Sequence, residues 1–197
     1  MWTGFAKLLH WVMAALLVAM VGAGLLMTRA ADAAAESGDF SARVLGLTIF
    51  DAYQLHKSVG VVLFALVILR LGWRMSHPAP ALPAHMPRVE KTAARAAHVV
   101  LYGLMFALPV TGWLLASASP LGIPTLVFGL FPLPHPLAGD AGTEAVLAWV
   151  HFLGAMALMA LAAAHVAAAL KHHFIDRDDV LVAMLPGRRG PSKGGRT

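Results

Sequence analysis

Four histidines of this chain lie inside long apolar segments: His10, His56, His151 and His165. An ionisable side chain in the apolar core of a membrane is costly, so such residues usually have a function. His151 and His165 are fourteen residues apart on one segment, which in an α-helix is about four turns and roughly 21 Å. Their imidazoles therefore share one helix face at two different depths.

The four histidines fall into two pairs of equal depth. His10 follows Lys7 by three residues at the start of its segment, and His165 lies near the matching end of the last segment. His56 and His151 lie near the opposite ends. A six-coordinate haem b takes one imidazole on each face of its iron, and facing helices of a bundle can supply both. We expect two stacked haems, one held by His10 and His165, the other by His56 and His151.

Two alternatives to haem could explain the four histidines. Histidines that only hydrogen-bond across helices are the simplest alternative, but the pairwise match in depth favours a bound prosthetic group. Zinc or copper would be poorly held by two sites of two histidines each. The chain has no cysteine, which excludes disulfides, iron–sulfur clusters and covalently attached haem. Arg70 shares a face with His56 at the depth of the other pair, where it could bind a haem propionate or anchor the helix end.

Membrane helices must position these residues. Of the 197 residues, 59% are hydrophobic and 13% charged, a composition typical of integral membrane proteins. Four apolar runs approach the twenty or so residues that cross a bilayer. We expect an all-α integral membrane protein, a four-transmembrane-helix bundle forming one domain over 1–186, and a basic disordered tail over 187–197. The expected spans are about 8–27, 55–73, 96–117 and 146–172.

The distribution of charge predicts the orientation of the spans. Segments 74–95 and 173–197 are rich in lysine and arginine, whereas 28–54 carries more acids than bases and 118–145 has neither lysine nor arginine. Cytoplasmic loops are the basic ones, so we expect both termini in the cytoplasm. Basic residues beside apolar helices face anionic lipid, so the net charge of +5 needs no nucleic-acid partner. The first run could also be a cleaved signal peptide, but its length and His10 favour a retained span.

Several short motifs resemble those of the bacterial cytochrome b561 family. They are His10-Trp11, LHKSVG at 55–60, AHVVLY at 97–102, ALPVTG at 107–112 and AHVAAALKHHF at 164–174. Their order and spacing are similar to the small four-helix di-haem type that includes superoxide oxidase, over nearly the whole chain, with the loops matching least. The resemblance implies a multi-pass protein of the bacterial inner membrane, two haem b groups with the ligand pairs given above, and exchange of electrons with ubiquinone.

The resemblance also implies a substrate and candidate binding residues. Superoxide would deliver an electron at the outer surface, and Lys57 beside His56 is the candidate that attracts this anion. The outer loops are net acidic, and a lysine at a helix end also snorkels toward water. Candidates for a quinone-head pocket lie at the inner ends of the spans, where a polar cluster around the propionates is the alternative reading: Arg95, His98, Tyr102 and His172.

Three functions are consistent with these features. The leading one is a di-haem oxidoreductase that carries electrons from a periplasmic one-electron donor, above all superoxide, to ubiquinone. The second is the cytochrome b subunit of a larger quinone-linked oxidoreductase, in which a partner subunit supplies the electrons. The third is a haem-free metal or proton transporter, which would be colourless. All three place membrane lipid around the chain.

Overall fold

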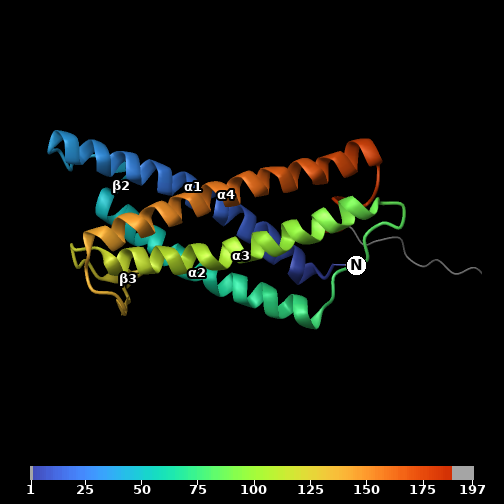
Figure 1. Cartoon of the computed structure of the whole chain (residues 1–197), viewed down its shortest axis with the longest axis horizontal. Coiled ribbons are helices and arrows are strands. Elements are labelled where there is room, and N and C mark those ends of the chain that lie inside the picture. Colours follow the sequence, from blue (N-terminus) through green and yellow to red (C-terminus); the bar gives the residue numbers. More distant parts are fainter. Residues whose placement is uncertain (1, 188–197) are drawn as a thin grey trace, which may run out of the picture.

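The computed structural model describes residues 2–187, and four long helices make up most of them (Figure 1). Each helix is long and apolar enough to cross a membrane. This confirms the predicted all-α fold with four spans, although every helix extends beyond at least one end of its predicted span. The predicted disordered tail covers residues 187–197. Of these, only Gly187 is among the described residues. The helices are α1 (Gly4–Ser37), α2 (Ile49–Ser76), α3 (Arg88–Ala118) and α4 (Ala141–Lys171).

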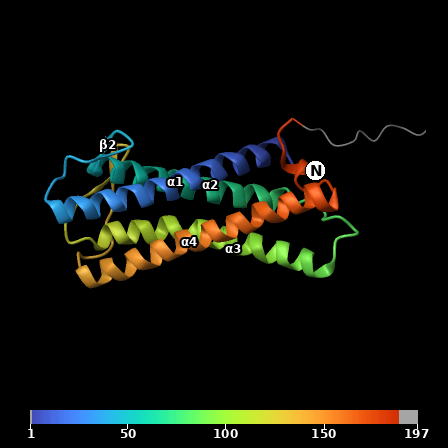
Figure 2. The ribbon, with the colours of Figure 1, turned by 90° about the horizontal axis from the view of Figure 1, so that it is seen from above.

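The helices lie side by side along one long axis (Figures 1 and 2). The main contacts join α1 to α2, α2 to α3, and α3 to α4. Two short antiparallel hairpins, β1–β2 and β3–β4, lie at the end of the bundle opposite the N-terminus. We call this the hairpin end and the other the terminal end. The strands are β1 (Arg43–Val44), β2 (Leu47–Thr48), β3 (Thr125–Val127) and β4 (Phe131–Leu133).

Side chains before the helices fix where three of them begin. Thr3, Thr48 and Asp140 each accept a hydrogen bond from a backbone N–H in the first turn of α1, α2 and α4. These N-caps satisfy donors that have no partner within the helix. α3 begins after Pro87, and α1 ends before Gly38, whose φ of 72° is open to glycine at little cost.

Large apolar side chains cover much of the outside of the bundle. Val18 and Val166 are exposed, whereas Met13, Val67 and Leu158 are among the few fully buried residues. A protein in water would bury more of its large aliphatic residues. In a bilayer the lipid chains cover the exposed ones, so the surface fits the membrane location that the four spans indicate.

The chain after α4 folds back against the start of α1. It forms a single turn of π-helix, η1 (His172–Asp176), and a 3₁₀ turn, η2 (Val182–Met184). Lys7 Nζ donates to the Leu185 carbonyl at 3.0 Å, and Trp11 Nε1 donates to the Met184 carbonyl at 2.9 Å. Both ends of the described chain therefore lie at the terminal end, and its location in the cytoplasm stays a prediction.

Candidate functional site

Two pairs of histidines face each other between the helices. The ring centres of His10 on α1 and His165 on α4 are 6.3 Å apart. Those of His56 on α2 and His151 on α4 are 6.4 Å apart. The first pair lies toward the terminal end and the second toward the hairpin end, and α4 contributes one ring to each. The structure thus brings the four predicted ligands together in the two predicted pairs.

The ring spacing fits one iron between the imidazoles of each pair. With a metal–nitrogen bond of about 2 Å and about 1.2 Å from nitrogen to ring centre, two imidazoles that held one metal between them would have ring centres up to about 6.4 Å apart. A direct hydrogen bond between the two rings, with about 3 Å between nitrogens, would hold the centres within about 5.4 Å. The observed distances of 6.3 and 6.4 Å exceed the limit of about 5.4 Å for a direct hydrogen bond and match the value of about 6.4 Å for a shared metal. The geometry therefore favours a shared metal over histidines that bond to each other.

Glycines leave room for the rings of the hairpin-end pair. A Cβ atom added to Gly112 would lie 3.0 Å from Cε1 of His151, which is too close without movement of the ring. A Cβ atom on Gly24 would lie 3.4 Å from Cε1 of His56, an ordinary contact. Our reading of the sequence assigned no role to either glycine, because their importance depends on which helix faces meet.

Polar partners differ between the two rings of the hairpin-end pair. Nδ1 of His151 lies 3.2 Å from the hydroxyl of Thr111 on α3. Nδ1 of His56 is buried, and it has no hydrogen-bond partner among the described residues. A buried nitrogen without a partner is rare, so the two rings of this pair differ in the support that they receive from the protein.

Arg70 of α2 reaches the terminal-end pair. Its Nη2 lies 3.2 Å from Nδ1 of His10, and its Nε donates to the Tyr102 hydroxyl at 3.0 Å. Its Nη1 is buried without a hydrogen-bond partner in the described part of the chain. A buried guanidinium nitrogen is costly unless it is paired, and a carboxylate is its strongest partner. A haem propionate would supply that carboxylate, so the environment of Arg70 suits the role predicted from its depth.

A third histidine lies beside the terminal-end pair. The ring centre of His98 on α3 is 5.2 Å from that of His165. Nδ1 of His98 lies 2.6 Å from the Ala94 carbonyl, which can only accept, so this nitrogen carries the proton. Its Nε2 is then free of the proton. His98, which the sequence predicts as a quinone contact, is therefore the residue that could compete with His10 as a ligand.

The other quinone candidates lie in different surroundings. Tyr102 and Arg70 line a hollow with Trp2, Trp73 and Arg74, and the Arg74 guanidinium lies 5.8 Å from the centre of the Tyr102 ring. Arg95 is exposed on α3. Only His98 and Tyr102, of the four, are thus shown close to the residues of the terminal-end pair.

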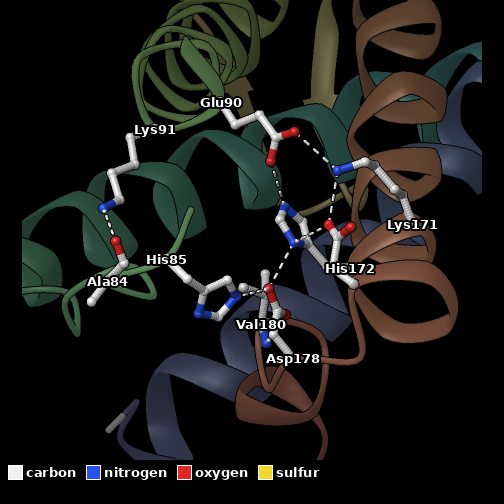
Figure 3. A network of polar contacts seen from close by, with 9 residues as sticks. Ala84, His85, Glu90, Lys91, Lys171, His172, Asp178 and Val180 are labelled. Carbon is white, nitrogen blue, oxygen red and sulfur yellow. Dashed lines mark hydrogen bonds and ion pairs between the residues drawn. The ribbon is translucent and has the colours of Figure 1, made fainter. Parts of the chain in front are cut away.

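His172 belongs to a separate polar network at the terminal end (Figure 3). Its Nδ1 lies 2.8 Å from Oδ2 of Asp178, and Lys171 Nζ donates to Glu90 at 3.0 Å and to Asp176 at 2.8 Å. The network joins the first turn of α3 to the end of α4. Sequence reasoning missed it, because Glu90 and Asp178 are far from each other in the chain and lie outside the motifs, so no local pattern joins them to Lys171 and His172.

The β3–β4 hairpin is fastened beside His56. The side-chain amide of Gln54 donates to a carbonyl just before β3 at 2.8 Å and accepts from the Leu126 N–H at 3.2 Å. The hydroxyl of Ser58 bonds to the same hairpin. Since these two residues flank His56 in the chain, the hairpin is held in place relative to that ring. Lys57, the predicted steering residue, is half-buried in the same turn of α2.

Comparisons with known proteins show the family of the chain. A family model described as prokaryotic cytochrome b561 matches residues 1–187. The chain is 37% identical over 183 residues to "Cytochrome b561 homolog 2" of Escherichia coli (strain K12), a match that covers 89% of this chain and 86% of the relative. It is 29% identical over 137 residues to "Probable superoxide oxidase CybB" of Yersinia pestis, covering 70% of this chain and 76% of the relative. The chain therefore belongs to the prokaryotic cytochrome b561 family.

Proposed function

We propose that this inner-membrane protein is a di-haem b cytochrome that carries electrons from superoxide, on the periplasmic side, to ubiquinone. Membership of the cytochrome b561 family makes it a haem b protein of membrane electron transport. The number of haems, the ligands, the donor and the acceptor belong to the proposal. The observation that carries it is the pair of histidine spacings, 6.3 and 6.4 Å, each of which suits one iron.

The ligand assignment follows from that spacing. His10 and His165 would hold the haem at the terminal end, and His56 and His151 the haem at the hairpin end. When bound, each haem supplies an iron that takes up and returns one electron. An iron held by two histidines in this way would have no position left for oxygen, which suits electron transfer.

Helix α4 sets the separation of the two sites. His151 and His165 lie fourteen residues apart on this continuous helix, which corresponds to roughly 21 Å along its axis. The hydrocarbon core of a bilayer is about 30 Å thick. The two sites together therefore reach across most of the membrane, so an electron entering at one face has a path to the other.

Two observations support superoxide as the donor. One relative is named as a probable superoxide oxidase. Lys57 adjoins His56 at the hairpin end and offers a positive charge to a small anion. In the proposed reaction two superoxide ions each lose one electron and become dioxygen. One ubiquinone takes up these two electrons and two protons and becomes ubiquinol.

Residues at the terminal end support the quinone as acceptor there. The Tyr102 hydroxyl accepts from Arg70 and keeps its own hydrogen for a carbonyl oxygen of a quinone head, whereas the proton-free Nε2 of His98, beside His165, can accept from the hydroxyl of the quinol. The exposed Arg95 and the His172 network lie further along the same ends of α3 and α4. We assign these two to the polar rim through which protons reach the quinone.

The test is reduction of ubiquinone by superoxide in proteoliposomes. The purified protein is given an enzymatic source of superoxide, with and without superoxide dismutase, and both the haem spectrum and ubiquinol are followed. The proposal predicts haem reduction that the dismutase abolishes and one ubiquinol for every two superoxide ions. Haem that dithionite reduces but superoxide does not would reject superoxide as donor. Together with a co-purifying soluble subunit, that result would establish the alternative, a cytochrome b subunit of a larger complex.

A further inference from the structure

We propose that Thr111 is the positioning residue of the hairpin-end pair, which fixes His151 in the tautomer that can bind iron. The inference rests on the proposed haem function and adds a residue for which the sequence predicted no role. Thr111 lies on α3, and its hydroxyl is 3.2 Å from Nδ1 of His151 on α4. The contact therefore joins two helices next to a candidate ligand.

The count of hydrogens decides the direction of this bond. A threonine hydroxyl has one hydrogen, and Thr111 Oγ1 donates it to the Leu108 carbonyl at 3.0 Å. The hydroxyl must then accept from His151, so Nδ1 of His151 carries the ring proton. Thr111 therefore selects the tautomer of His151 that carries the proton on Nδ1.

The selected tautomer is the one that haem ligation requires. A neutral imidazole has one N–H and one nitrogen with a free lone pair, and a metal binds through the lone pair. With the proton on Nδ1, the lone pair is on Nε2. A hydrogen bond from the second ring nitrogen also fixes the orientation of the ring and makes the ligand more basic. Thr111 would thus act on the metal site without touching it.

Gly112, the next residue, provides the space that this arrangement needs. An added Cβ atom would lie 3.0 Å from Cε1 and 3.4 Å from Nδ1 of His151. One residue therefore orients the ring and its neighbour allows the ring to approach α3. In the part of the chain that the structure describes, the other ring of the pair has no such support, since Nδ1 of His56 has no partner.

The test compares Thr111→Val, which removes the hydroxyl at nearly constant shape, with Thr111→Ser, which keeps it. Thr92→Val is the matched control, because Thr92 is on the same helix and makes the same kind of bond, to the Arg88 carbonyl at 3.0 Å. Each change is also made in a His165→Ala background, so that the signals of the hairpin-end haem are read alone. The readouts are haem per chain, the rate of haem transfer to apomyoglobin, the midpoint potential and the electron paramagnetic resonance spectrum.

Thr111→Val should weaken binding of one haem by about 10- to 100-fold, the usual effect of losing an outer partner of a metal-bound histidine. Its midpoint potential should rise, because a less basic imidazole stabilises the oxidised iron less. Thr111→Ser and Thr92→Val should match the unchanged protein. The inference is overturned if Thr111→Val keeps both the affinity and the potential, if both haems weaken equally, or if Thr111→Ser loses as much as Thr111→Val. Should Thr111→Val fail to accumulate, Thr111→Ala takes its place. Absence of haem from the unchanged protein would instead refute the proposed function itself.

Discussion

The two histidine pairs share a spacing but not an environment. At the hairpin end the groups in contact with the two rings are uncharged, namely the Thr111 hydroxyl and two glycines, and the charge of Lys57 lies one residue further along α2 from His56. At the terminal end the Arg70 guanidinium contacts His10, and His98 lies beside His165. Each spacing would suit one iron under the proposed function, whereas the groups that contact the rings differ in charge. The difference suggests that the fold tunes its two sites separately.

The difference in charge predicts which of the two haems has the higher reduction potential. Reduction of a haem iron adds one negative charge, and a nearby guanidinium favours that state. The terminal-end haem should therefore have the higher potential of the two. Electrons would then move from the hairpin end to the terminal end, which is the direction that the proposed function requires.

Replacing one of the four ligand histidines should have the largest effect, which is the loss of one haem. His10→Ala or His165→Ala should remove only the terminal-end haem, and His56→Ala or His151→Ala only the hairpin-end haem. Pyridine haemochrome analysis of each purified variant should give about half of the original haem, because the remaining site keeps both of its ligands. His98→Ala is the control and should keep both haems. An equal loss of haem in His98→Ala would show that His98, not His10, pairs with His165.

Crowding should break the hairpin-end site while leaving the other intact. Gly112→Ala places a methyl group 3.0 Å from the His151 ring and should cost about 1 to 3 kcal/mol, typical of overpacking. Gly24→Ala, at 3.4 Å from the His56 ring, is the matched control and should cost much less. Thermal release of haem, followed at the Soret band, measures both. If the two variants release haem at the same temperature, the close approach of His151 to α3 is wrong.

Removal of the Arg70 guanidinium should change the reduction potential of the terminal-end haem but not that of the hairpin-end haem. Arg70→Gln should lower the potential of the terminal-end haem by the equivalent of about 1 to 2 kcal/mol, as expected for a charge within about 10 Å at an effective dielectric constant of about 20. Redox titration of the two haems measures this shift. Arg95→Gln, at an exposed position on the same end, should leave both potentials nearly unchanged. A potential that rises in Arg70→Gln would contradict the assigned direction of electron flow.

Removal of the positive charge of Lys57 should have the smallest effect, on the rate at which superoxide reduces the haem. Lys57→Gln should slow haem reduction by superoxide a few-fold at low ionic strength, and the difference should shrink as salt screens the charge. Stopped-flow absorbance at several salt concentrations checks this. Lys91→Gln, on the opposite end of the bundle, should leave the rate unchanged. The steering role is excluded if Lys57→Gln reacts at the original rate in dilute buffer.

Local patterns in the sequence predict the spans and the candidate ligands. An apolar run of about twenty residues identifies a span without knowledge of the other helices. The depth of His10 or His151 in the membrane then follows from its position within the run. The four helices and the meeting of these histidines in pairs follow from such patterns. Whether they ligate haem is still a prediction, as is the orientation of the termini.

Neighbours across helices could not be predicted in the same way. Thr111 and Gly112 matter because one face of α3 meets His151 on α4, and no local pattern states which faces meet. The ion pair of Lys171 with Glu90 likewise depends on long-range packing and on the π-helical turn after α4. A polar residue such as Thr111 in an otherwise apolar span was the available signal, since membrane helices hold polar groups where they find a partner.

The most direct test of the account is the number and type of haem in the purified full-length protein. A reduced-minus-oxidised visible spectrum identifies the haem, and pyridine haemochrome analysis against protein concentration gives the haem per chain. Because each of the two histidine pairs would hold one haem, we expect sharp b-type bands at two haems per chain. One haem per chain, or a colourless protein from haem-sufficient cells, would contradict it.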